Sequence, residues 1–295
     1  MIYRVRHTTS YAYGGTVNLA VHMLHLRPRP LDRQHVVSAG LAADPQPSRR
    51  REGVDHFGNG VTWLFLNRPH PGFEVTAEAV VDVRSPRLPA PGATPPWEGV
   101  RDLARLGGPA AWQAAEFVFD SPMAPADPAA GAYAAASFPP GRPVLEGLVE
   151  LNGRIFRDFR FRSGVTTIAT PVREVMQRRQ GVCQDFSHVM IAMLRALGLP
   201  ARYVSGYIRT RPPPGQPRRI GADVSHAWVG AWLGPDHGWV DLDPTNDLLV
   251  GDEHVVLAWG RDYADVSPTR GVILGGGGTH GLKVSVDLEP LEGPA

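Results

Sequence analysis

The stretch Arg178-Arg-Gln-Gly-Val-Cys-Gln-Asp-Phe-Ser-His-Val-Met-Ile-Ala-Met-Leu-Arg-Ala-Leu-Gly198 contains Cys183, the single cysteine of the chain. Apolar side chains follow it at the spacing of a helix with one buried face: Phe186, Val189, Met190, Met193, Leu194 and Leu197. The helix should begin near Cys183 and end at Gly198. Unpaired N–H groups and the dipole of a first helical turn favour a thiolate. The position therefore suggests a reactive thiol, although a lone cysteine is more often a small buried core residue.

Bulk properties exclude several classes of protein. The length of 295 residues suggests about two domains. A net charge of +1 gives no electrostatic case for nucleic acid or an anionic membrane as a partner. One cysteine excludes an internal disulfide and a cysteine-rich zinc site. The first residues resemble no signal peptide and no long apolar run occurs, so we expect a cytoplasmic protein without a membrane span.

Alternating strand patterns dominate residues 1–84, which we predict to form an antiparallel β domain. Its strands are expected at 2–13, 17–26, 34–43, 61–66 and 73–83, with a turn at Gly14-Gly15. Residues 85–140 are rich in proline and alanine and indicate a linker with a helical segment.

The remaining part, residues 141–295, should form an α+β core. It is expected to contain a helix at 144–156, a short helix opened by Thr170 and Pro171, and the helix after Cys183. Strand-like runs follow at 201–210, 225–233, 238–243, 271–274 and 282–288. The glycine run 275–278 lacks the Lys-Ser/Thr of a phosphate loop and is predicted to be a hairpin turn.

A cysteine nucleophile requires a base for its proton and a third group that orients the base. His226 lies on one predicted strand and Asp243 ends the next, beyond the turn 234–238. Antiparallel pairing of these strands would bring the two side chains together, with one ring nitrogen on the carboxylate and the other toward sulfur. Asp241 is the alternative acid, because residues two apart share a strand face.

Three blocks of the chain resemble the signature blocks of the transglutaminase-like superfamily of cysteine enzymes: Gly181-Val-Cys183, His226-Ala-Trp228 and Gly238-Trp-Val-Asp-Leu-Asp-Pro-Thr245. The nucleophile of that family matches Cys183, its histidine His226 and its aspartate Asp243. Residues 7–13 and 55–59 also resemble the β domain that precedes this core in bacterial members. The resemblance implies an α+β fold, namely a papain-like cysteine-proteinase core with an N-terminal antiparallel β domain.

The implied reaction is acyl transfer or hydrolysis on an amide of a peptide or protein, through a thioester on Cys183 that water or an amine resolves. Neither a cofactor nor a metal is expected. The backbone N–H of Cys183 would be one donor to the oxyanion, and Gln177 and Gln180 are candidate side-chain donors.

Two rival interpretations stay open. The chain could be a binding or scaffold module that keeps the geometry of the triad without turnover. Alternatively, His188, His226 and Asp185 could ligate the metal of a hydrolase, although an acid such as Asp185 also suits the first turn of a helix by charge alone.

Overall fold

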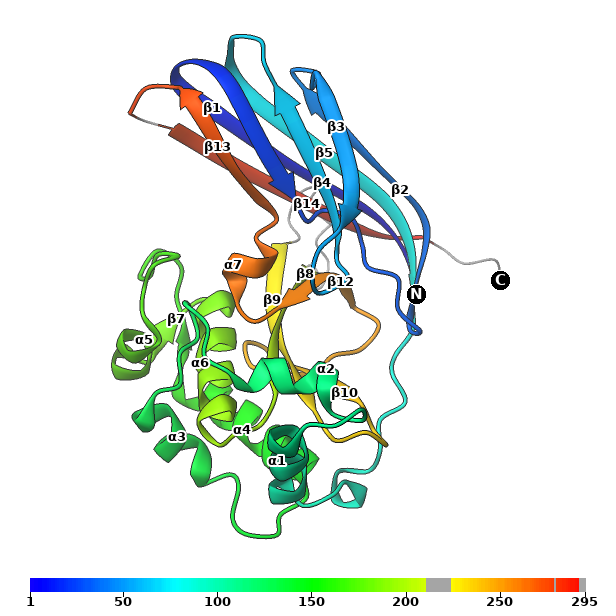
Figure 1. Cartoon of the computed structure of the whole chain (residues 1–295), viewed down its shortest axis with the longest axis vertical. Coiled ribbons are helices and arrows are strands. Elements are labelled where there is room, and N and C mark those ends of the chain that lie inside the picture. The colour runs from blue at the N-terminus through cyan, green and yellow to red at the C-terminus, as the bar shows by residue number, and fades with distance from the viewer. Residues whose placement is uncertain (211–223, 279, 292–295) are drawn as a thin grey trace, which may run out of the picture.

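A bent antiparallel sheet lies above a helical core that contains a second antiparallel sheet (Figure 1). The structure is a computed structural model that describes residues 1–210, 224–278 and 280–291. The predicted α+β class with an N-terminal antiparallel β domain is confirmed.

The bent sheet has the strand order β2-β5-β1-β4-β3, and β13 and β14 also pair with β1. Its apolar residues alternate along the strands, as expected for a sheet with one buried face. The strands are β1 (Ile2–Leu24), β2 (Gln34–Asp44), β3 (Arg49–Val54), β4 (Gly60–Leu66), β5 (His70–Val83), β13 (Thr269–Gly275) and β14 (His280–Leu291).

Strand β1 is continuous, so the predicted break into two strands at Gly14-Gly15 is wrong. Its first half pairs with β5 and β14, and its second half pairs with β4 and β13. The run 275–278 is therefore a bend beside β1 and not the predicted hairpin turn. Glycines permit it because Gly275, Gly276 and Gly277 adopt φ of 100°, 90° and 72°. A side chain on Gly15 would also approach the Gly277 nitrogen to 3.4 Å.

The predicted domain boundaries need two corrections. The last strands, within 269–291, complete the N-terminal sheet and do not belong to the core that was predicted to span 141–295. Helices in the predicted linker, residues 85–140, pack into the main hydrophobic cluster through Val100, Ala104 and Ala130. Strand β3 was not predicted, because all its residues are exposed and carry no apolar alternation.

The core contains a five-stranded sheet of order β11-β10-β9-β8-β12, against which helix α6 packs through β8 and β9. The strands are β8 (Ala201–Ile208), β9 (Val224–Trp232), β10 (Trp239–Asp243), β11 (Leu248–Leu249) and β12 (His254–Gly260); the short pair is β6 (Arg160–Phe161) and β7 (Gln180–Gly181). The helices are α1 (Trp97–Leu106), α2 (Trp112–Ala115), α3 (Pro128–Ala135), α4 (Val144–Asp158), α5 (Val172–Arg178), α6 (Cys183–Ala196) and α7 (Tyr263–Val266); the single 3₁₀ turns are η1 (Pro91–Ala93) and η2 (Glu116–Val118).

The predicted helix after Cys183 is confirmed as α6, which is buried from Asp185 to Arg195. The predicted helix at 144–156 is confirmed as α4. Helix α5 begins after Pro171 without a side-chain cap, because the Thr170 hydroxyl accepts the Thr167 N–H instead of capping the helix.

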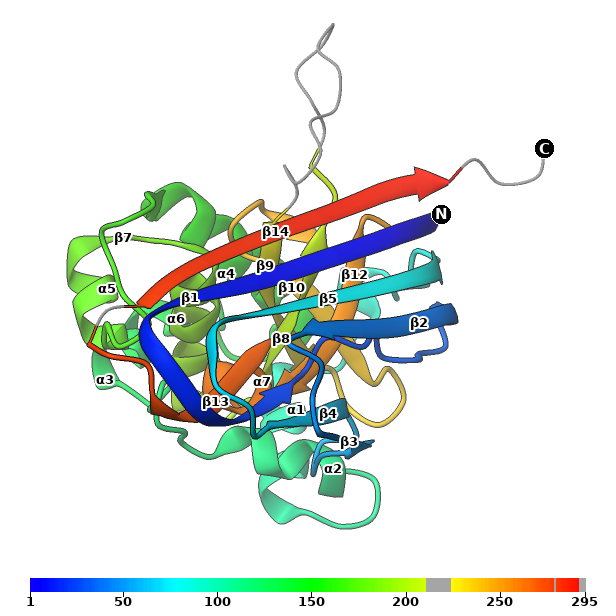
Figure 2. The ribbon, with the colours of Figure 1, turned by 90° about the horizontal axis from the view of Figure 1, so that it is seen from above.

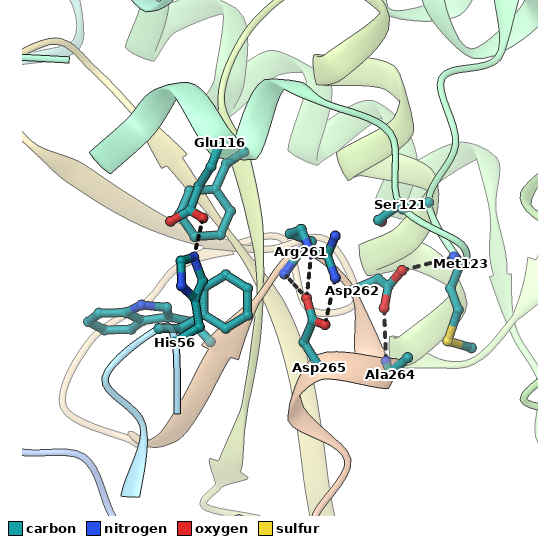
Figure 3. A network of polar contacts seen from close by, with 12 residues as sticks. His56, Glu116, Ser121, Met123, Arg261, Asp262, Ala264 and Asp265 are labelled. Carbon is teal, nitrogen blue, oxygen red and sulfur yellow. Dashed lines mark hydrogen bonds and ion pairs between the residues drawn. The ribbon is translucent and has the colours of Figure 1, made fainter. Parts of the chain in front are cut away.

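Polar contacts fasten the segment after α2 to both halves of the molecule (Figure 3). His56, from the turn between β3 and β4, lies 2.8 Å from the Glu116 carboxylate. The Met123 N–H donates to Asp262 Oδ2 at 2.9 Å, and the Ala264 N–H donates to the other oxygen of that carboxylate at 2.9 Å. The polar network therefore holds this segment against the start of α7.

Among the residues that the structure describes, no helix is long and apolar enough to span a bilayer.

Candidate active site

Cys183 is the first residue of α6 and is partly exposed. The Asp185 carboxylate folds back over the start of this helix, where Oδ2 accepts the Val182 N–H at 2.8 Å and the Thr166 hydroxyl at 2.7 Å. A Cβ on Gly181 would lie 2.6 Å from that oxygen, so glycine is required there. Asp185 thus shapes the turn that presents Cys183, and it is buried.

His226 and Asp243 meet across two neighbouring strands. Strands β9 and β10 pair antiparallel, and His226 Nε2 lies 2.7 Å from Asp243 Oδ2. Asp241, the alternative acid, instead accepts a hydrogen bond from Arg33 at 3.0 Å. The arrangement that was predicted for His226 and Asp243 is therefore present, and Asp243 is the acid that contacts the ring.

Further donors surround the buried Asp243 carboxylate. Oδ2 also accepts from Asn246 Nδ2 at 2.7 Å and lies 3.3 Å from His254 Nε2, while Oδ1 accepts the Thr245 N–H at 2.9 Å. Burial by itself raises the pKa of Asp243, but the hydrogen bonds from His226 and His254 outweigh it and lower that pKa below its usual range. Asp243 is consequently an anion at neutral pH.

The pKa of His226 depends on both of the other predicted residues, Asp243 and Cys183. Burial by itself lowers the pKa of His226, but hydrogen bonds to Asp243 and to the Cys183 side chain outweigh it and raise the pKa from 6.5 to about 10. Because Asp243 occupies Nε2, Nδ1 is the ring nitrogen left for the sulfur. The ring is therefore protonated at neutral pH and placed between carboxylate and thiol.

His254, on β12, belongs to the same cluster and was not predicted from the sequence. It is buried, and its ring packs edge-on against Trp228 at 5.2 Å between centroids. Its run of apolar neighbours indicates a core strand and gives no sign of a contact with Asp243. One ligand atom each from His226, Asp243 and His254 lies within 4.8 Å of the others, a spacing that a metal could use. The hydrogen bonds of both histidines to Asp243 Oδ2 explain this close spacing equally well.

The residues of the predicted metal site are engaged elsewhere. His188 Nε2 accepts the Tyr263 N–H at 3.2 Å, and Asp185 is hydrogen-bonded to the turn before α6. Burial lowers the pKa of His188 to about 4, which keeps its ring neutral. Within the described part of the chain, His188 and Asp185 form no ligand group with His226.

A cleft of about 390 Å³ opens beside Cys183 and His226. The part of its lining that the structure describes includes Gln184 but neither Gln177 nor Gln180, the two candidate donors to an oxyanion. The bent sheet contributes to this cleft through β1 and β14. The cleft therefore lies between the N-terminal sheet and the core.

The fold and this geometry define a papain-like α+β protein that brings a cysteine, a histidine and an acid together. Residues 134–244 match the transglutaminase-like superfamily, and residues 3–82 match the bacterial transglutaminase-like N-terminal region. The chain belongs to the transglutaminase-like superfamily, as its signature blocks indicated.

Relatives in mycobacteria resemble the chain along nearly its whole length. An uncharacterized protein of Mycobacterium tuberculosis is 44% identical over 99% of this chain and 94% of its own length. One of Mycobacterium leprae is 30% identical over 98% of both chains. A protein-glutamine gamma-glutamyltransferase of Pseudomonas aeruginosa is 40% identical, but over only 31% of this chain and 15% of its own length.

A solved structure from Cytophaga hutchinsonii, described as a candidate cysteine protease, superposes on all of this chain and 92% of its own with a TM-score of 0.75. The sequence identity is 21%, so this likeness shows the shared two-part fold. Superfamily and fold together support a thiol-dependent hydrolase or transglutaminase-like activity.

Proposed function

We propose that the protein cleaves or transfers an amide acyl group of a peptide or protein, with Cys183 as nucleophile, His226 as base and acid, and Asp243 as orienting group. One observation carries the proposal: the His226 ring is hydrogen-bonded to the Asp243 carboxylate at 2.7 Å and lines the same cleft as Cys183. A thiol, an imidazole and a carboxylate in that order are the parts that nucleophilic thiol catalysis requires.

The reaction would proceed in two steps. Sulfur of Cys183 attacks the amide carbonyl carbon, the C–S bond forms, and the C–N bond breaks as His226 gives its proton to the leaving amine. Water or an amine then attacks the thioester, with the neutral His226 accepting its proton, and the thiolate is restored. The backbone N–H of Cys183, at the start of α6, is suited to stabilise the oxyanion because it precedes the first intrahelical bond.

The Asp243 carboxylate fixes the ring. Its hydrogen bond to Nε2 leaves Nδ1 toward the sulfur, and its negative charge stabilises the imidazolium. His254 and Asn246 hold that carboxylate by donating to its Oδ2, so we assign them a positioning role.

Alkylation tests the identity of the nucleophile. Iodoacetamide should label Cys183 at pH 6 faster than it labels a model thiol, because the sulfur lies at the N-terminus of α6 and shares a cleft with the positively charged His226 ring. The Cys183→Ala variant should lose amidase and esterase activity. Labelling no faster than that of the model thiol, together with full activity of Cys183→Ala, would disprove the proposal and favour a binding or scaffold module.

Hydrolysis and amine transfer remain two outcomes of one thioester. The similarity to a protein-glutamine gamma-glutamyltransferase supports a glutamine side chain as one acyl donor. Product analysis with and without a primary amine separates the two: a free acid indicates hydrolysis and an amide indicates transfer. We also propose a cytoplasmic location, where a reduced thiol persists, and cell fractionation with an antibody would test it.

A further inference from the structure

Strands β1 and β14 run side by side in the N-terminal sheet (Figure 2). Residues of both strands line the cleft beside Cys183. Strands β1 and β14 pair antiparallel, and residues two apart on a strand face the same side. Three cross-strand pairs from these strands line the cleft: His7 with Val286, Thr9 with Val284, and Tyr11 with Leu282. These six residues, here called the β1–β14 wall, lie opposite the catalytic side chains.

The His7 and Thr9 side chains of the β1–β14 wall are hydrogen-bonded to each other, and His7 also contacts the core. His7 Nδ1 lies 2.9 Å from the Tyr207 hydroxyl, and its Nε2 lies 2.8 Å from Thr9 Oγ1. Burial lowers the pKa of His7 to about 4, so the ring is neutral at physiological pH. The wall thus presents apolar side chains and a closed, uncharged hydrogen-bond chain to whatever occupies the cleft.

Apart from Cys183 and His226, the other described residues that line the cleft carry no charged side chain. Within the described part of the chain, no aspartate, glutamate, lysine or arginine lines the cleft. Tyr203, Tyr263 and Ser205 supply aromatic and hydroxyl surface from the core. A charged side chain that lay against the β1–β14 wall, away from His226, would lose water without gaining a counter-ion from the described lining residues, which is costly, whereas an amide or apolar side chain would not.

We propose that the β1–β14 wall selects acyl donors whose side chain beside the reacting carbonyl is uncharged, such as glutamine or an apolar residue, over those with glutamate or lysine. The inference rests on the proposed thiol chemistry and adds a substrate class to it. It also gives the N-terminal sheet a direct part in substrate recognition, with Val284 and Leu282 as specificity-determining residues.

A matched pair of substrates tests the selection. The p-nitrophenyl esters of N-acetylglutamine and N-acetylglutamate have nearly equal size and differ in charge. Release of nitrophenolate at pH 7 measures the acylation rate constant of each. We expect glutamine to react at least about tenfold faster than glutamate, because a site gains little from a group whose charge it leaves unpaired.

Two variants test whether the β1–β14 wall causes the preference for the glutamine ester. Val284 is 48% exposed, so Val284→Lys should fold, and its ammonium should narrow or reverse the preference by pairing with the glutamate carboxylate. Val272→Lys is the control, because Val272 is 75% exposed on β13 of the same sheet and does not line the cleft. Its preference should equal that of the wild type.

The possible results distinguish failure of the proposed substrate selection from failure of the proposed thiol chemistry. Acylation of Cys183 by both esters at equal rates, or an unchanged ratio in Val284→Lys, would overturn the selection and leave the thiol chemistry intact. Absence of an acyl-enzyme with either ester would refute the proposed function and the selection with it.

Discussion

Replacement of Asp243 by asparagine should disable the proposed site without removing a side chain from the core. Oδ2 faces donors from His226, Asn246 and His254, and Oδ1 faces the Thr245 N–H. An asparagine has one acceptor oxygen, so its NH₂ must point at one of these sets of donors. The substitution therefore removes the negative charge and breaks at least one hydrogen bond.

The size of the effect follows from the pKa of His226. With Asp243 present that pKa is about 10; without the carboxylate its two contributions are lost, burial still lowers the pKa, and only Cys183 still raises it. The protonated fraction of the ring at pH 8 should therefore fall from the nearly complete protonation of the wild type. Loss of the orienting acid in a comparable triad costs about 10⁴-fold in rate, roughly 5.4 kcal/mol. We expect a loss of that order in kcat/KM for Asp243→Asn.

The assay is acylation by an activated ester, followed from pH 5 to pH 11. The wild type should keep its rate until the His226 imidazolium loses its proton near pH 10. In Asp243→Asn the alkaline decline should begin at a lower pH than in the wild type, because the pKa of His226 falls. Asp241→Asn is the matched control: it lies two residues away on β10 and pairs with Arg33, so the position of the decline should not move.

An unchanged pH profile in Asp243→Asn, with circular dichroism confirming the fold, would refute the orienting role. An equal shift in Asp241→Asn would point to general electrostatics and not to the contact between Asp243 and His226.

Three further predictions concern neighbouring groups. His254→Leu should lower kcat about tenfold with little change in KM, because it removes a hydrogen-bond donor to Asp243. His254→Gln should recover part of that loss, because its amide can donate to the same oxygen. Asp185→Ala should lower the free energy of unfolding by about 1–3 kcal/mol in urea titrations, since the Val182 N–H loses its partner. The folded-state pKa of His226 exceeds 6.5, so its stabilisation is complete below pH 6.5 and lost as pH rises through about 10. Urea unfolding at pH 7 and pH 10.5 should show this loss in the wild type, and a similar loss in His226→Gln would contradict it.

The sequence was informative where local pattern and chemistry coincide. The helix after Cys183 follows from its apolar spacing, and the meeting of His226 with Asp243 follows from two strands joined by a short turn. Both features depend on residues that are close along the chain. Over such short separations, the spacing of residues limits how their side chains can be arranged. The choice of Asp243 over Asp241 needed the resemblance, because both acids suit one strand face.

Contacts between distant segments were harder to predict. His254 reaches Asp243 from β12, at the far edge of the core sheet, and its apolar surroundings resemble any buried strand. The closing strands pair with β1 across 245 to 289 residues, which no local pattern specifies, so residues 269–291 were assigned to the wrong domain. The same pairing brings Leu282 and Val284 into the cleft.

Intact-mass measurement after incubation with an activated ester tests the central claim most directly. If Cys183 is the nucleophile, the wild type should gain the mass of one acyl group, peptide mapping should place it on Cys183, and hydroxylamine should release it as expected for a thioester. Cys183→Ala should gain no mass. An acyl group on another residue, or equal acylation of Cys183→Ala, would contradict the account.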